Sequence, residues 1–165
     1  MSQPIVIDSL VFAREARSLQ GDLPISCLGR VLDLLADTSG SVHYRIDGQV
    51  NSEKKRPQLR LQIDGVLSVS CQRCLEGVSH SLKISSLLEF VDDEEALTQE
   101  EIEDDSRDFL PAQGEVDVVA LIEEEIILDL PVAPRHKSCA LPDSRQDKTE
   151  FSPFVVLKGL KGKAS

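Results

Sequence analysis

The chain has 165 residues, about the length of one domain, and 41% of them are hydrophobic, which is enough for one buried core. With 28% charged residues, no apolar run near the ~20 residues of a membrane-spanning helix and no signal sequence at its start, we expect a soluble, cytoplasmic protein and exclude an integral membrane protein. The net charge of −11 argues against an extensive basic surface for nucleic acid, although residues 89–108 alone hold eleven acidic side chains and one arginine.

Two short helices are predicted near the N-terminus. Ser9 can cap the first helix. Its apolar face consists of Phe12, Ala16 and Leu19. The second helix begins near Ser26, where apolar residues at i, i+3, i+4 and i+7 gather into one stripe. This stripe consists of Leu28, Val31, Leu32 and Leu35.

Three β-strands are predicted next, because apolar and polar residues alternate with period two. The first covers residues 42–50, the second resumes after a polar loop over 51–58, and the third follows a turn over 72–77. Gly65 interrupts the second alternating series and indicates a bend or bulge. Short connections favour antiparallel neighbours, so we expect a meander. The inward residues are Val42, Tyr44, Ile46 and Val50, then Leu59, Leu61, Ile63, Leu67, Val69 and Cys71, then Val78, His80, Leu82, Ile84, Leu88 and Phe90.

Two segments lack the pattern of a packed element. In the acidic segment the carboxylates repel one another and the apolar residues are isolated, so we expect a mobile loop over about 91–114. The last segment, about 140–165, has the composition of a linker followed by a short amphipathic tail.

The main helix is predicted between Asp117 and Pro131. Glu123 and Glu124 lie outside its apolar stripe, whereas Glu125 projects nearest to it and, if buried, would need a partner such as an arginine. The stripe consists of Val118, Val119, Ile122, Ile126 and Leu130. Together the elements predict a single α+β domain over 1–165. Its antiparallel β meander, a sheet or a partly open barrel, is packed by one main helix and the short N-terminal helices.

The sharpest local feature is a pair of segments with cysteine and histidine. Cys71-Gln72-Arg73-Cys74 ends the second strand, and His136-Lys137-Ser138-Cys139 follows the main helix. The x2 spacing lets both members of each pair face one ion, and three thiolates with one imidazole would complete a structural zinc site. The alternative is that the cysteine pair only ends a strand while the second segment is an unrelated loop. The candidate metal ligands are Cys71, Cys74, His136 and Cys139.

Other chemistry finds little support in the sequence. A thioredoxin-like CxxC pair lies at a helix N-terminus, whereas a strand is predicted after Cys74. A disulfide is disfavoured in the cytoplasm. Three consecutive glutamates, Glu123 to Glu125, fan around a helix by ~100° each and cannot share one centre. No phosphate loop, nucleophile elbow or Ser-His-Asp arrangement is recognisable, so we expect no enzymatic activity and no catalytic residues.

Two basic clusters are candidate contacts for RNA or a protein partner. Cations beside phosphate displace counterions, and a local cluster can act even in a chain that is acidic overall. The alternative is that the clusters serve solubility only. Aromatic residues make up 4% of the chain, so we expect no stacking platform for single strands. The candidate residues are Lys54, Lys55, Arg56 and Arg60, and near the C-terminus Lys158, Lys161 and Lys163.

Three segments, in this order, resemble the bacterial family of large ribosomal RNA subunit accumulation proteins, also called YceD proteins. The first is Cys71–Glu76 at the end of a strand. The second runs from Asp117 through the acidic helix to a Pro-x-x-Pro-x-His motif that ends at His136, and Cys139 follows. The third is the closing stretch Pro153–Lys161. The resemblance covers about the last 100 residues.

This resemblance implies a non-enzymatic cytoplasmic factor needed for synthesis, processing or stability of large-subunit (23S) ribosomal RNA, and hence for ribosome biogenesis. Such a factor would meet ribosomal RNA or ribosomal proteins and no membrane. The acidic segment from Glu89 to Asp108 would be available to a basic ribosomal protein. The alternative function is a zinc-stabilised adaptor between proteins that does not contact RNA.

Overall fold

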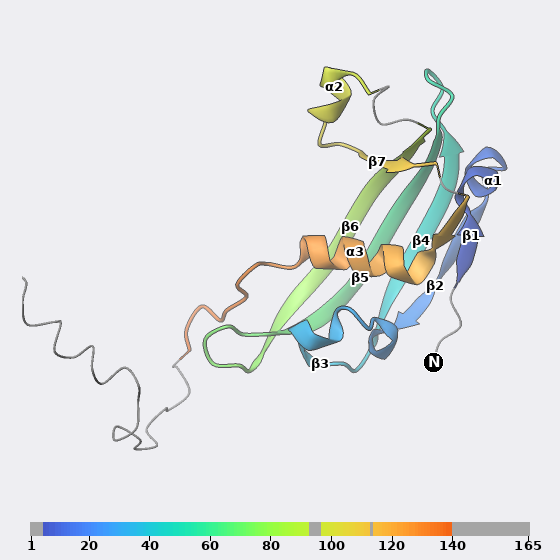
Figure 1. The fold of residues 1–165 in the computed structure, drawn as a ribbon. Coiled ribbons are helices and arrows are strands. Elements are labelled where there is room, and N and C mark those ends of the chain that lie inside the picture. Colours follow the sequence, from blue (N-terminus) through green and yellow to red (C-terminus); the bar gives the residue numbers. More distant parts are fainter. Residues whose placement is uncertain (1–4, 93–96, 113, 140–165) are drawn as a thin grey trace, which may run out of the picture.

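Strands with alternating burial form the centre of the fold. The computed structural model describes residues 5–92, 97–112 and 114–139. Its elements are β1 (Val6–Asp8), α1 (Ser9–Arg14), β2 (Ser18–Pro24), β3 (Leu35–Asp37), β4 (Ser41–Val50), β5 (Pro57–Ser70), β6 (Gly77–Val91), α2 (Gln99–Ile102), β7 (Asp108–Pro111), β8 (Glu115–Asp117) and α3 (Val118–Asp129). In these ranges a six-stranded sheet has the order β2-β4-β5-β6-β7, with β3 paired to β5 beside that path, and β1 pairs with β8 separately (Figure 1). The fold is α+β, as predicted, and the sheet is open.

The predicted meander is confirmed as β4, β5 and β6. The three strands pair antiparallel, with Ile46 opposite Leu61 and Ile63 opposite Ile84. Period-two alternation turns the apolar side chains of β4 and β5 to one buried face, where each large side chain contributes roughly 1.5–3 kcal/mol. The opposite face of these strands carries polar side chains and is exposed.

Two glycines allow close packing against the meander. Gly65 pairs with Leu82 in unbroken register, so the predicted bend or bulge is wrong. A Cβ atom on Gly65 would lie 3.0 Å from Cγ1 of Val42 on β4. A Cβ atom on Gly48 would overlap the carbonyl oxygen of Phe12. Glycine at these positions therefore lets neighbouring elements approach, α1 above all.

The first N-terminal helix is shorter than predicted. α1 ends at Arg14, and its N-cap is Asp8 rather than Ser9, since the Asp8 carboxylate accepts a backbone N–H of the first turn at 2.9 Å. The prediction is also wrong for Leu19, which lies in β2 opposite Ile46 of β4. Pairing with a neighbouring strand outweighs helical spacing here, because local helix propensity is only a weak preference.

The second predicted helix, from Ser26, is not an α-helix. Two single turns of 3-10 helix, Ile25–Cys27 and Leu32–Leu34, occupy this segment before β3. Gly29 lies between the turns and disfavours a continuous helix. The apolar spacing still marks buried positions. The fully buried ones are Leu28 and Val31.

The described residues of the acidic segment, for which a mobile loop was expected, contain regular structure. α2 begins with a capping box, in which the side chains of Thr98 and Glu101 each accept a backbone N–H of the other residue. β7 then pairs parallel with β6, with Leu88 opposite Asp108. Pairing with basic side chains, described below, outweighs the repulsion among the carboxylates.

The main helix is confirmed as α3, which crosses one face of the sheet (Figure 1). Its N-cap, Asp117, accepts hydrogen bonds from the backbone N–H groups of Val119 and Ala120 at 2.9 and 3.3 Å. The helix ends before Pro131, which has no N–H to continue it. Its fully buried residues are Val118, Ile122 and Ile126.

Two carboxylates of α3 are buried, which is contrary to the prediction for Glu123. Glu123 accepts a hydrogen bond from the backbone N–H of Arg30 at 2.9 Å. Glu125 accepts one from the hydroxyl of Ser86 on β6, so its partner is not the expected arginine. Burial raises the pKa of Glu125. The two contacts hold α3 against the segment before β3 and against β6.

The predicted linker and tail, about 140–165, lie outside the described residues, and so do Lys158, Lys161 and Lys163. None of the helices in the described ranges combines the length and the hydrophobicity that a membrane crossing needs.

Candidate metal centre

The first half of the centre is a tight turn after β5. Cys71 is fully buried, and its backbone N–H donates to the carbonyl oxygen of Glu76 at 2.8 Å. Leu75, at a φ of +65°, donates its N–H to the carbonyl oxygen of Cys71 at 2.9 Å. The N–H of Arg73 points at the Cys71 sulfur, 3.4 Å away. The turn thereby folds back and brings the thiol of Cys74 to that of Cys71.

The second half is the loop that follows α3. The carbonyl oxygen of Pro134 accepts the backbone N–H of Gln72 at 2.8 Å, so this loop lies against the turn. Pro134 also favours an extended backbone before it, which carries the chain away from the end of the helix. The next residues, as far as Cys139, are therefore placed beside the two thiols.

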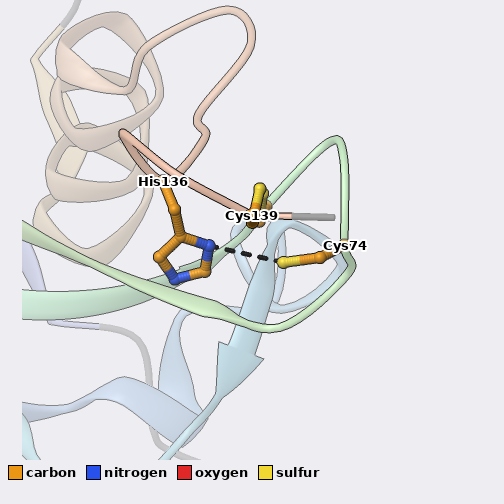
Figure 2. A group of neighbouring side chains, drawn as sticks. Cys74, His136 and Cys139 are labelled. Atoms are coloured by element: carbon orange, nitrogen blue, oxygen red, sulfur yellow. Dashed lines mark hydrogen bonds between the residues drawn. The ribbon is translucent and has the colours of Figure 1, made fainter. Parts of the chain in front are cut away.

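All four predicted ligands meet at one point. The sulfur of Cys74 lies 3.3 Å from Nδ1 of His136 (Figure 2). The sulfurs of Cys71 and Cys139 are 3.9 Å apart. The four ligand atoms all lie within 4.8 Å of one another. In a zinc tetrahedron with bonds of ~2.3 Å to sulfur and ~2.1 Å to nitrogen, ligand atoms are about 3.5–3.8 Å apart. The donor set and its spacing fit a metal ion of this kind.

The imidazole of His136 is oriented for ligation through Nδ1. Its Nε2 lies 3.0 Å from the carbonyl oxygen of Gly77, to which an Nε2–H can donate. That hydrogen bond places the proton on Nε2 and leaves the lone pair of Nδ1 facing Cys74. A backbone carbonyl in this role is typical of the partners that hold metal-binding histidines.

The thiols of the cluster are electrostatically coupled. Burial would raise the pKa of Cys71, but the backbone N–H groups of Cys74, Arg73 and His136 face its sulfur and lower the pKa to about 5. Burial raises the pKa of Cys139, and the neighbouring sulfurs of Cys71 and Cys74 raise it further. One thiolate thus opposes the ionisation of the next, and a cation would relieve this repulsion. A thioredoxin-like role is disfavoured because β6, not a helix, follows the turn.

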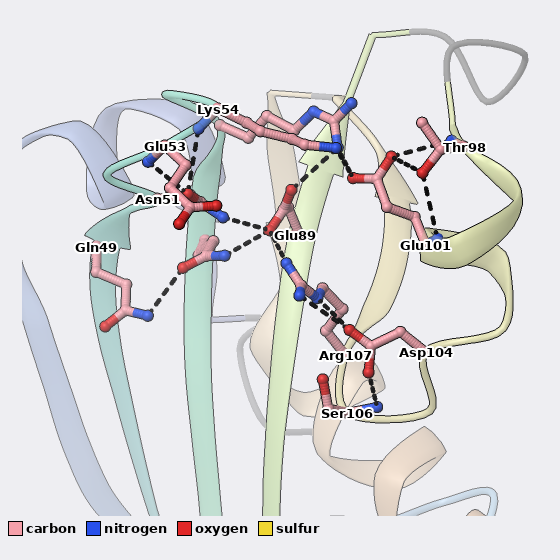
Figure 3. A network of polar contacts seen from close by, with 12 residues as sticks. Gln49, Asn51, Glu53, Lys54, Glu89, Thr98, Glu101, Asp104, Ser106 and Arg107 are labelled. Atoms are coloured by element: carbon pink, nitrogen blue, oxygen red, sulfur yellow. Dashed lines mark hydrogen bonds and ion pairs between the residues drawn. The ribbon is translucent and has the colours of Figure 1, made fainter.

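A buried carboxylate, Glu89 of β6, lies at the end of the long strands that is opposite to the candidate metal centre (Figures 1 and 3). Its side chain is 0% exposed, and Arg56 and Arg107 approach its two oxygens at 3.2 and 3.4 Å. The side-chain amides of Gln58 and Asn51 also donate to it. Burial raises the pKa of Glu89, but these four partners outweigh burial and lower it below the ordinary value.

Glu101 of α2 extends this network to the predicted basic cluster. Its carboxylate lies 2.7 Å from Nζ of Lys54 and 2.6 Å from Nη1 of Arg56 (Figure 3). The backbone N–H of Thr98 donates to it at 3.0 Å. Lys54 and Arg56 therefore fasten the acidic segment to the turn between β4 and β5. Two of the cations predicted to meet phosphate are thus already paired with carboxylates.

The other members of the predicted cluster lie apart from this network. Lys55 is exposed in the same turn, at a φ of +55°. Arg60 is exposed on β5, opposite Asp47 of β4, and belongs to the polar face of the sheet. The structure thus brings Lys54, Lys55 and Arg56 together and leaves Arg60 elsewhere.

The pairing of Glu101 should make the protein less stable in acid. Lys54 first, then Thr98 and Arg56, lower the pKa of Glu101 from 4.5 to about 2, against the effect of burial. The pKa of Glu101 is lower in the folded state than in the unfolded state. Its contribution to stability is therefore complete above the unfolded-state pKa and is lost as the pH falls through the folded-state pKa. We expect Glu101→Gln to remove up to about 3 kcal/mol of the change in unfolding free energy between about pH 5 and about pH 2. Urea unfolding of the wild type and of Glu101→Gln across this pH range measures the difference. Unfolding free energies that change in parallel with pH in the two proteins would contradict the prediction.

Sequence reasoning identified the four candidate metal ligands but missed Glu89 and Glu101 as partners of the basic cluster, and Arg107 as a second cation beside Glu89. One local signal was available, since Thr98 and Glu101 have the spacing of a capping box before a helix. The ion pairs of Arg56 join residues 33 and 45 positions apart, which no local pattern reveals.

Comparison with known proteins gives a consistent result. A family model described as "Large ribosomal RNA subunit accumulation protein YceD" matches residues 59–161, a range that begins in β5 and includes all four candidate ligands. A curated protein of that name from Haemophilus influenzae is 26% identical, and the alignment covers 97% of this chain and 97% of the relative. No solved structure matches the chain.

Proposed function

This chain belongs to the YceD family of large ribosomal RNA subunit accumulation proteins, and on that premise we propose that it is a non-enzymatic ribosome biogenesis factor needed for the accumulation of 23S ribosomal RNA. The family match over residues 59–161 is the observation that carries the proposal. The relative from Haemophilus influenzae, which aligns with this chain over nearly its whole length, supports the proposal. The factor would act in the cytoplasm on the synthesis, processing or stability of this RNA, by contact with the RNA or with ribosomal proteins.

The candidate metal centre supports a structural role. We propose that Cys71, Cys74, His136 and Cys139 hold a zinc ion, which would join the turn after β5 to the loop after α3. Four protein ligands leave no coordination position for water or substrate, in contrast to catalytic zinc sites with three. A closed site of this kind supports a factor that binds and does not catalyse.

Depletion of the protein in its own organism tests this function. We expect the amount of mature 23S RNA to fall relative to 16S RNA, with a loss of large subunits in sucrose gradients and accumulation or decay of 23S precursors. Northern blots and RNA sequencing measure the ratio, and re-expression of the wild-type protein should restore it. An unchanged ratio together with a normal subunit profile would contradict the proposal.

A second candidate function is a zinc-stabilised adaptor that binds only proteins. One observation favours it: the carboxylates of Glu89 and Glu101 already neutralise Lys54 and Arg56. Crosslinking in cells, followed by nuclease treatment, separates the two functions. An adaptor should retain its ribosomal protein partners after nuclease and crosslink to no RNA, whereas direct crosslinks to 23S RNA would exclude it.

A further inference from the structure

A cationic pocket lies between the end of α1 and the turn that joins β4 to β5. It has a volume of about 290 Å³, near the lower end of the ~300–1,000 Å³ typical of small-molecule sites. Arg14 of α1 lines one side, and Lys54, Lys55 and Arg56 of the turn line the other. The one acidic residue among its lining is Asp92. The pocket thus gathers four cations against one carboxylate.

Hydrogen bonds fix the backbone of the turn that carries three of these cations before any ligand arrives. The side-chain oxygen of Asn51 accepts the backbone N–H groups of Glu53 and Lys54 at 2.9 and 3.2 Å. The backbone N–H of Lys55 donates to the carbonyl oxygen of Asn51 at 3.0 Å, and Gly48 lets α1 pack close to β4. Binding to a preformed turn avoids much of the entropy cost of ordering a loop.

Two of the four cations are available for a ligand. Arg14 and Lys55 are exposed, and neither forms an ion pair with any carboxylate of the described residues. Lys54 is 39% exposed and is shared with Glu101, whereas Arg56 is 20% exposed and bridges Glu101 and Glu89. An anion in the pocket would therefore meet Arg14 and Lys55 first and then compete with Glu101 for Lys54.

We propose that this pocket binds backbone phosphate groups of RNA, with Arg14 and Lys55 as the main contacts and Glu101 as an internal competitor for Lys54. The proposal rests on the proposed function in 23S RNA accumulation and names the surface that would meet the RNA. All four cations precede residue 59 and so lie outside the segment matched by the family model, which includes Asp92 on the pocket lining.

A phosphate backbone fits the site better than an acidic polypeptide does. The pocket is concave and its cations come from two elements, so it can surround a compact tetrahedral anion from two sides. The acidic segment of this same chain already supplies a glutamate to Lys54, and a further carboxylate would gain little over Glu101. An RNA strand carries a series of phosphates, so its binding gains free energy from counterion release, whereas binding of a single carboxylate side chain does not.

Anisotropy measurements with a fluorescein-labelled oligouridylate and the full-length protein test the site. Arg14→Gln with Lys55→Gln should weaken binding roughly ten- to thirtyfold at about 0.1 M salt, because each lost contact with single-stranded RNA lowers the salt slope by about 0.7. Glu101→Gln should strengthen binding severalfold, since it removes the competitor of the phosphate. Opposite signs for the two variants, together with no change in the control below, locate the effect at this pocket.

The matched control is Arg17→Gln with Lys83→Gln, which also removes one arginine and one lysine but leaves the pocket lining unchanged. It should bind the oligouridylate like the wild type, and a cooperative thermal transition above the assay temperature shows that each variant is folded. Equal weakening by the control, or binding of polyglutamate but not of the oligouridylate, would overturn the proposal. If depletion lowers 23S RNA while the pocket variant binds as the wild type does, only the pocket fails. If depletion leaves 23S RNA unchanged, the proposed function fails independently.

Discussion

Chelating the proposed zinc ion from the purified protein should lower the midpoint temperature of thermal unfolding by about 8 to 16 °C. A ligand at a thousandfold its dissociation constant adds about 4 kcal/mol of stability, and each kcal/mol moves the midpoint of a domain of this length by about 2 to 4 °C. The physical reason is that a cation at the proposed site would offset the repulsion of the thiolates among four ligand atoms within 4.8 Å of one another, and would add to the hydrogen bonds between the turn and the loop. Thermal melts with chelator, and again after zinc is restored, measure the shift.

The cysteines of the chain offer a matched control for this prediction. Cys74→Ser removes one ligand and should abolish most of the zinc-dependent shift. Cys27→Ser alters the cysteine outside the cluster and should retain the shift. A wild-type midpoint that is the same with chelator and with zinc would contradict a structural metal.

Arg56→Ala should lower the free energy of unfolding by about 3 to 5 kcal/mol at neutral pH. The variant leaves the carboxylate of Glu89, which is 0% exposed, with Arg107 as its remaining cation at 3.4 Å. It also removes a cation 2.6 Å from Glu101 and so loosens the acidic segment. Because Arg107, Gln58 and Asn51 remain, we expect a value near the lower end of the range. Urea unfolding measures the change.

A surface ion pair provides the comparison. Arg45 is 49% exposed and lies 2.7 Å from Asp47, and Arg45→Ala should cost less than about 1 kcal/mol. Combining Arg56→Ala with Glu89→Gln should recover part of the lost stability, because the buried charge is then removed with its partner. Equal losses of unfolding free energy for Arg56→Ala and Arg45→Ala would show that the burial of Glu89 does not increase the cost of removing its partner.

Local sequence pattern predicted correctly those elements in which the apolar spacing coincides with the buried face. The alternation of β4 and β5 and the stripe of α3 each mark one face that packs in the core, so periodicity and structure agree. Near the N-terminus the same reasoning failed for Leu19, because a free strand edge on β4 was available to pair with it. A local pattern does not contain the position of that edge.

Charge explains the other main difference. Eleven acidic residues over 89–108 suggested a segment that cannot pack, since the counterions are distant in sequence. Arg56 lies 33 residues before Glu89, and the fold of the meander alone brings them together. The candidate metal ligands were easier to recognise, because soft donors in two closely spaced pairs are informative before their geometry is known.

The contact between Cys71 and Cys139 joins positions 68 residues apart. A metal held at both ends acts as a cross-link around a long stretch of chain that includes β6, β7 and α3, and by polymer theory such a closure removes about 4 kcal/mol of entropy from the denatured state. In the denatured chain each pair of ligands can coordinate an ion only separately, as a bidentate site. Tight affinity for the ion should therefore develop late in folding, once β5 and α3 are docked, and would report that the sheet is complete.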